Sequence, residues 1–291
     1  MKTRRRSRKL RGGGENAAAI IGNEITATIV EQASTQVLRI TMPPGSTIVT
    51  DQNTMSHMTG NLVTNAKMGG GDDRGQQGSG LFNAIKRAVS GESLFVNHVT
   101  NPTSEMAEIT LAPTIPSAIA EITINPGDEW KLYPGALIAA TNNVKVSGSI
   151  NIFDNFSSSL VTGSPIYTSV SVDAGSSESG RVWISGFGGI EKRDIKASTT
   201  PFVINNGVFL AVPAKYWNTY IKVGTAGGIL NSFMTSIGFV MKIQADTDAN
   251  TNPTIPLYMQ TINIHNFKEM IRTIAVRASD SASRTQITIS E

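Results

Sequence analysis

The sequence predicts an all-β protein, and three observations lead to that fold class. Apolar and polar residues alternate with a period of two in several segments, which is typical of strands with one buried face. Turn-forming residues separate these segments. The chain has 291 residues, of which 40% are hydrophobic and 16% charged, so it can bury a large core and is too apolar to be mainly disordered. We therefore expect a sandwich or barrel of many short strands.

Four segments carry the alternation most clearly. In each, apolar residues share one parity, while mainly polar residues occupy the other. The strand-forming sets are Ile25, Ala27 and Ile29; Val144, Val146, Ile150 and Ile152; Ile166, Thr168, Val170 and Val172; and Ile262 and Ile264. Turns between strands are expected at Pro43-Pro44-Gly45, Asn125-Pro126-Gly127, Pro134-Gly135 and Asn205-Asn206-Gly207.

One segment departs from this pattern and predicts a short helix over residues 81–89. Its apolar residues recur at i, i+4, i+7 and i+8, which places them on one helical face: Leu81, Ile85, Ala88 and Val89. Ser79 can cap its start, and Gly91 suits its end. A second short helix is predicted from Asn266 to about Val276.

The chain also repeats itself. Gly45 matches Gly127, and Asn53 matches Gly135, at an offset of 82 residues. A third copy begins near Ile195, at an offset of 72 from the second. These units are too long for a solenoid, so we expect three similar β-lobes around a pseudo-threefold axis. The predicted lobes span about 20–110, 111–190 and 191–265 within a domain of residues 15–265, and residues 266–291 form a C-terminal helix or tail.

The charge is concentrated in an arm formed by residues 1–14. Its first eleven residues contain seven basic side chains and no acid: Lys2, Arg4, Arg5, Arg6, Arg8, Lys9 and Arg11. Subtracting them from the 25 basic residues leaves 18 against 22 acidic ones, so the rest of the chain carries about −4. Dense like charges keep the arm extended, and Gly12-Gly13-Gly14 supplies a flexible joint. The arm is expected to be disordered or bound to a partner.

Three interpretations of the arm remain open. It suits a polyanion, which could be nucleic acid, acidic lipid or an acidic protein groove. It could instead be a mitochondrial targeting sequence, because it is rich in arginine and free of acids, although only Met1 and Leu10 are apolar. The third interpretation is a solvated tail. No apolar run of the secretory type follows directly, and no stretch is long enough for a membrane-spanning helix.

Catalytic and metal-binding patterns are not found. The chain contains no cysteine, which excludes disulfides, thiolate catalysis and every cysteine-ligated metal site. The histidines, His57, His98 and His265, lack the spacing of zinc ligands. Gly75 and Gly80 have the spacing of a phosphate loop, but Leu81 follows where the lysine would stand. We therefore expect no enzyme, no metal and no cofactor.

The tryptophans could in principle stack on bases, since aromatic side chains do so in single-strand binders. They are Trp130, Trp183 and Trp217. Because no lysine or arginine clusters surround them, packing in the core or at an oligomer interface is the preferred interpretation.

The stretch from Gly78 to Asn101, GSGLFNAIKRAVSGESLFVNHVTN, resembles the most recognisable part of the altered-inheritance-of-mitochondria family. The fold of that family is akin to the trp RNA-binding attenuation protein. The matching motif residues are Gly80, Leu81, Lys86, Arg87, Gly91, Glu92, Ser93, Leu94 and Phe95. The segments 126–140 and 184–191 fit too, and the resemblance covers about residues 20–265. Asp51-Gln52-Asn53 stands where the family usually keeps Pro-Gly.

The resemblance implies an all-β, three-lobed fold that self-associates and has no established catalytic residues. The arm is not a family feature, and it looks like those of virion proteins of large DNA viruses. The first functional hypothesis is therefore a non-enzymatic virion component, a minor capsid protein that assembles with itself or with other capsid or scaffold proteins. The alternative is a cellular, mitochondrial-type member of scaffold or biogenesis role, located in the mitochondrion or cytoplasm, with the arm as its targeting sequence.

Overall fold

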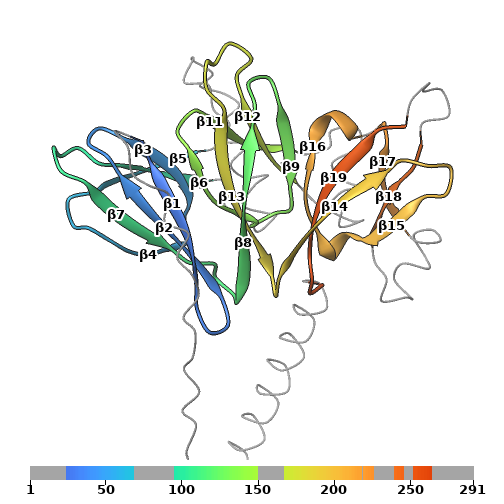
Figure 1. Cartoon of the computed structure of the whole chain (residues 1–291), viewed down its shortest axis with the longest axis horizontal. Coiled ribbons are helices and arrows are strands. Elements are labelled where there is room, and N and C mark those ends of the chain that lie inside the picture. Colours follow the sequence, from blue (N-terminus) through green and yellow to red (C-terminus); the bar gives the residue numbers. More distant parts are fainter. Residues whose placement is uncertain are drawn as a thin grey trace, which may run out of the picture.

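The fold is seen in a computed structural model, which describes residues 24–68, 95–149, 167–217, 219–225, 239–245 and 252–263 (Figure 1). In these ranges the chain is almost entirely antiparallel β-structure, which confirms the predicted fold class. The described helices are two short 3-10 turns, η1 (Asn206–Val208) and η2 (Ala214–Tyr216). The helices predicted over residues 81–89 and 266–276 lie outside the described residues.

After a leading strand, β1 (Thr26–Glu31), the strands form three consecutive sets of six. The first set is β2 (Gln36–Met42), β3 (Thr47–Asp51), β4 (Met55–Met58), β5 (Val63–Met68), β6 (Phe95–Thr100) and β7 (Ala107–Leu111). The second is β8 (Ser117–Ile124), β9 (Glu129–Leu132), β10 (Leu137–Thr141), β11 (Val144–Ser149), β12 (Tyr167–Val172) and β13 (Gly180–Phe187). The third is β14 (Ile190–Lys196), β15 (Phe202–Asn205), β16 (Phe209–Pro213), β17 (Ile221–Thr225), β18 (Phe239–Ile243) and β19 (Thr254–Gln260).

Each set pairs its strands in the same order. The first strand pairs with the sixth, and the sixth pairs with the third, as in β8–β13–β10. The second strand pairs with the fifth, and the fifth pairs with the fourth, as in β9–β12–β11. Each set therefore contributes one group of three strands to each of two sheets.

Adjacent sets are joined where the second strand of one pairs with the third strand of the next. These joints, β3–β10 and β9–β16, create two six-stranded sheets, β5-β6-β3-β10-β13-β8 and β11-β12-β9-β16-β19-β14. The remaining strands form the four-stranded sheet β1-β2-β7-β4 and the three-stranded sheet β15-β18-β17. Figure 1 shows the three sets side by side, with the first and third at opposite ends. The expected threefold axis is not confirmed, because the joint occurs twice and not three times.

The sheets pack against one another through two hydrophobic cores. One core lies between the four-stranded sheet and the first six-stranded sheet, and Leu38, Ile109 and Trp183 are fully buried there. The larger core includes Val170, Phe209 and other residues of the second six-stranded sheet. Neighbouring residues of β3 enter different cores: Ile48 lies in the first and Val49 in the second. A joint strand is thus covered on both faces, as expected of a strand inside a layered stack.

The repeat offsets recur in the backbone. Gly45 and Gly127, 82 residues apart, have φ values of 72° and 84° in the turns that follow β2 and β8. Only glycine adopts this left-handed region without strain, so the matching glycines mark the same turn in two sets.

The strands predicted around residues 25–29, 144–152 and 166–172 correspond to β1, β11 and β12 as far as the structure describes them. The fourth prediction was wrong in its described part. Strand β19 ends at Gln260, and Ile262 follows it in a bend with 44% of its surface exposed. The ladder with β14 ends at the pair of Ile190 with Gln260. Beyond it, the N–H groups of Thr261 and Ile262 donate to the carbonyls of Gly189 and Phe187 where β13 turns into β14, so the strand does not continue.

Candidate assembly edges

Most residues singled out from the sequence lie outside the described part of the chain. This holds for the basic arm from Lys2 to Arg11 and for the motif residues from Gly80 to Leu94. The last motif residue, Phe95, begins strand β6. The structure therefore leaves the roles proposed for the arm and the motif as predictions.

The described histidines lie on two different strands. His57 lies on β4 and His98 on β6, while His265 falls outside the described residues. Partial burial and the nearby charge of Lys67 lower the pKa of His98. Among the residues that the structure describes, no group of three or more acidic or histidine side chains could hold a metal ion.

The tryptophans belong to the cores. Trp183 is fully buried, and its indole N–H donates to Oε2 of Glu121 at 2.9 Å. Trp217 is 9% exposed and makes an edge contact with Tyr167, with ring centroids 4.6 Å apart. Trp130 packs edge-on against Tyr258. These contacts agree with the packing interpretation, since Trp183 and Trp217 are buried and the half-buried Trp130 packs against the larger core.

The third strand of the first set differs in burial from the third strands of the other two sets. Strands β4, β10 and β16 each pair with the sixth strand of their own set through the same bulge, at Met55/His57, Leu137/Ala139 and Phe209/Ala211. These positions are again 82 and 72 residues apart. The residues of β10 are buried except for the last, and all of β16 is buried. In contrast, the residues of β4 are exposed except for half-buried Met58.

The difference follows from pairing. In β10 and β16 the second edge is covered by β3 and β9. In the described residues, β4 pairs with β7 alone and has no strand on its other edge. A bare edge presents unpaired N–H and C=O groups to solvent, and any strand of matching register can pair with them.

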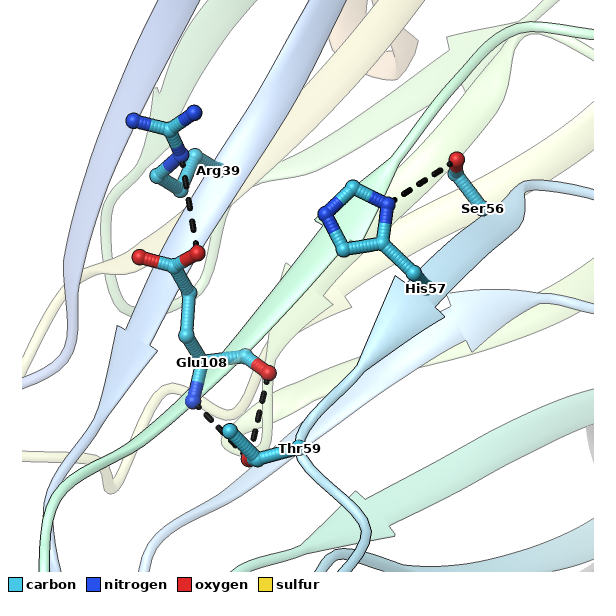
Figure 2. Close-up of polar contacts among 5 residues, drawn as sticks. All are labelled: Arg39, Ser56, His57, Thr59 and Glu108. Atoms are coloured by element: carbon cyan, nitrogen blue, oxygen red, sulfur yellow. Dashed lines mark hydrogen bonds and ion pairs between the residues drawn. The ribbon is translucent and has the colours of Figure 1, made fainter.

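Figure 2 shows the polar side chains of Ser56 and His57 on β4, with Thr59 just after the strand and the charged pair Arg39 and Glu108 on β2 and β7. Ser56 Oγ lies 3.2 Å from Nδ1 of His57, and both side chains are exposed. Thr59 closes the end of the strand: its N–H donates to the Glu108 carbonyl at 2.9 Å, and its hydroxyl accepts from the Glu108 N–H at 3.1 Å. Arg39 faces Glu108 at 3.6 Å, with both side chains 46% exposed, so this ion pair adds little to stability.

The second bare edge belongs to β15, the second strand of the third set. β15 pairs with β18, and among the described strands none covers its other edge. Its residue Val203 is 48% exposed, whereas the equivalent residue of the first set, Val49, is 2% exposed. In the second set the same position is Lys131, whose ammonium group contacts Glu129 and Ser169.

Sequence reasoning did not identify these edges, although a signal was present. The repeat offsets align Ser56 and His57 with Ile138 and Ala139 of the second copy, and with Leu210 and Ala211 of the third. A polar pair where two other copies are apolar marks the strand that lacks a cover.

Fold and site together define a class: an antiparallel β-protein of repeated six-strand units, whose described strands leave an uncovered edge at each end. The sequence model of the family described as Mitochondrial biogenesis AIM24 matches residues 27–247. The chain therefore belongs to this family, which confirms the resemblance to the altered-inheritance-of-mitochondria family seen in the sequence.

A solved structure agrees on the fold. The chain is similar to the crystal structure of protein SPYM3_0169 from Streptococcus pyogenes, with a TM-score of 0.63 and 19% identity over 86% of this chain and 100% of that one. No curated protein matches the sequence.

The comparisons support neither a virion protein nor the expected likeness to the trp RNA-binding attenuation protein, and the family match favours the cellular alternative. The part of the chain that the structure describes contains no helix with the length and apolar character of a membrane span.

Proposed function

We propose that this protein is a non-enzymatic scaffold of the mitochondrial type that acts by associating with copies of itself. The observation that carries the proposal is the pair of bare strand edges at the two ends of the stack. At the equivalent positions inside the molecule, β10 and β16 are buried by strand partners. Because no described strand covers β4 or β15, both edges are suited to assembly.

Light scattering coupled to size-exclusion chromatography tests the self-association. The mass of the full chain is 31.0 kDa, and we expect a species at a multiple of that mass whose population grows with concentration. A single peak at 31.0 kDa at every concentration would contradict the proposal.

The cellular location is proposed from the family, whose printed description is mitochondrial biogenesis. The similar solved structure comes from a bacterium, so the fold by itself does not assign a compartment. On this proposal the basic arm is an address, and the mature N-terminus should lie between about residues 12 and 19. Mass mapping of the N-terminus, combined with fractionation of the native source, tests this: an intact Met1 in a particle fraction would instead support the virion hypothesis.

A second role of the arm, contact with an anionic partner, rests on its seven basic residues. If the arm carries this contact, removing residues 1–14 abolishes binding to vesicles of acidic lipid and to nucleic acid. Binding by the full chain should weaken steeply as salt rises, because neutralised charges release counterions. Binding that survives the truncation would place the anion site on the body of the protein.

A further inference from the structure

We propose that β4 of one copy pairs antiparallel with β15 of the next copy, head to tail, with Met58 opposite Val203. This inference rests on the proposed self-association and specifies its interface. The partner is a second copy of this chain, and the pairing repeats a joint that the molecule already contains twice.

The register follows from the two internal joints. In the first, Ala140 of β10 stands opposite Val49 of β3. In the second, Val212 of β16 stands opposite Lys131 of β9. Both pairs occupy the same positions, because the residues of each strand differ by the repeat offsets of 82 and 72. Applying these offsets to the uncovered strands places Met58 opposite Val203. The neighbouring pairs are then His57 with Ile204 and Thr59 with Phe202.

The exposed apolar side chains fit this register. Val203 and Met55 are each 48% exposed, the highest values among the large apolar residues of the described chain, followed by Met106, Val63 and Ile262 at 44–47%. The residues equivalent to Met55 in the internal joints are Leu137 and Phe209, with exposures of 5% and 0%. Pairing of β4 with β15 would bring Val203 and Met55 into the environment that their equivalents already have.

The remaining sheet edges do not offer the same match. Strands β5, β11 and β17 form the same outer edge of their sheets in all three sets, and β8 and β14 form another such edge. The equivalent edge of β2 is covered by β1. β8 and β14 lack only a counterpart of β1, which belongs to none of the three sets. Among the described strands, only β4 and β15 lack the partner from a neighbouring set that their counterparts have.

A second copy, and not closure of the chain on itself, is the partner. Figure 1 places the sets that contain β4 and β15 at opposite ends of the molecule, with the second set between them. Joining the three strands β17-β18-β15 of one copy to the four strands β4-β7-β2-β1 of the next would give a seven-stranded sheet. It would keep the order of the internal six-stranded sheets and add β1. Such a heterologous contact leaves one free edge at each end, so it propagates into a ring or a fibre.

The polar residues of β4 set the strength of this joint. His57 occupies the position of Ala139 and Ala211, both fully buried in the internal joints. A larger polar side chain keeps the edge soluble before pairing and makes the contact between copies weaker than the internal joints. Assembly is therefore expected to depend on protein concentration.

Cysteine cross-linking tests the pairing, and the absence of native cysteine makes each introduced thiol unambiguous. Opposed residues of antiparallel strands have Cα atoms about 4.5–5.5 Å apart, which is within the range that a disulfide spans. We expect Met58→Cys and Val203→Cys, purified separately, mixed and oxidised, to form a disulfide-linked dimer. Each variant alone should stay monomeric on a non-reducing denaturing gel, and the double variant should give a ladder.

Several results would overturn the inference. A dimer formed by either single variant alone would mean that like edges pair with each other. A fast-migrating monomer from the double variant would mean closure within one chain. Val63→Cys, at 46% exposure on the outer edge strand β5, is the matched control partner for Val203→Cys, and equal cross-linking there would indicate random collision.

The neighbouring pair Thr59→Cys with Phe202→Cys provides a second test in case Met58→Cys disturbs folding. Light scattering of the unmodified protein separates the two proposals. A monomer would contradict the self-association itself, whereas an oligomer without either cross-link would contradict only the pairing of β4 with β15.

Discussion

At the scale of single residues, one buried amide organises the turn between β2 and β3. Asn101 is fully buried, and its Nδ2 donates to the carbonyls of Met42 at 2.9 Å and Glu105 at 2.7 Å. Its Oδ1 accepts from the N–H and the hydroxyl of Thr103. Its backbone also bonds to Gly45 and Ser46, so both halves of the residue fix the turn.

We expect Asn101→Ala to lower the free energy of unfolding by about 1–3 kcal/mol or more, because buried carbonyls lose their donors. Urea denaturation followed by circular dichroism measures this. Asn61→Ala is the matched control: its amide also bonds to Thr103, at 3.2 Å, but the contact is exposed. The control should change stability by less than about 0.5 kcal/mol. Equal losses in the two variants would contradict the assigned role of Asn101.

A second residue-scale prediction concerns Asp51, at the end of β3. Burial raises the pKa of its carboxyl group, although the hydrogen bond from the Asn53 N–H opposes the rise. A raised pKa in the folded state means that the charged form is less stable there than in the unfolded chain. The protonated carboxyl group of Asp51 therefore contributes to folding stability below pH 3.8, and this contribution is lost as pH rises through the folded-state pKa.

Asp51→Asn keeps the acceptor for Asn53 and removes the titration. We expect the variant to gain stability relative to the wild type between pH 3.5 and pH 7, as measured by urea denaturation at both values. A constant difference between the two proteins across this range would show that Asp51 does not titrate with a shifted pKa.

At the scale of elements, close packing of strands requires glycine at the start of β13. A Cβ added at Gly180 would lie 2.3 Å from Cγ2 of Val144 and 2.8 Å from Cγ2 of Val172. Those valines lie on β11 and β12, in the neighbouring six-stranded sheet. The missing side chain thus sets how closely the two sheets approach.

We expect Gly180→Ala to lower the free energy of unfolding by about 1–3 kcal/mol, the usual cost of overpacking. Gly60→Ala is the control, since a Cβ there would meet nothing within 4 Å. Thermal unfolding by calorimetry compares the two. If both variants melt together, the packing at Gly180 relaxes without cost and the close approach does not limit the fold.

Sequence reasoning predicted the elements better than their connections. Alternation located β1, β11 and β12, because a half-buried strand imposes a period of two on its own residues. It could not predict the joint of β3 with β10, since pairing between strands more than 80 residues apart leaves no local pattern. It failed at Ile262, where alternation continues beyond the last strand partner.

At the scale of the whole molecule, the sequence predicted that the chain contains three repeats, but it did not predict that the row of repeats ends in uncovered strands. The offsets of 82 and 72 recur in the registers of all three third strands. Whether the repeats close into a ring depends on the angle between neighbouring sets, which no single residue encodes. The polar pair Ser56-His57 is the one local trace of an open end.

The two open ends lead to a prediction about backbone protection. If β4 and β15 pair between copies, backbone amides of both strands become hydrogen-bonded in parallel as the protein concentration rises. Hydrogen exchange measured by mass spectrometry over a concentration series should then show protection growing in residues 55–59 and 202–205. The edge strands β5, β11 and β17 should exchange at rates that do not change, because they are equally uncovered in every set. Protection that grows in β4 without β15, or equally at all edges, would contradict a head-to-tail contact. Each such contact uses β4 of one molecule and β15 of the next, so both strands must gain protection.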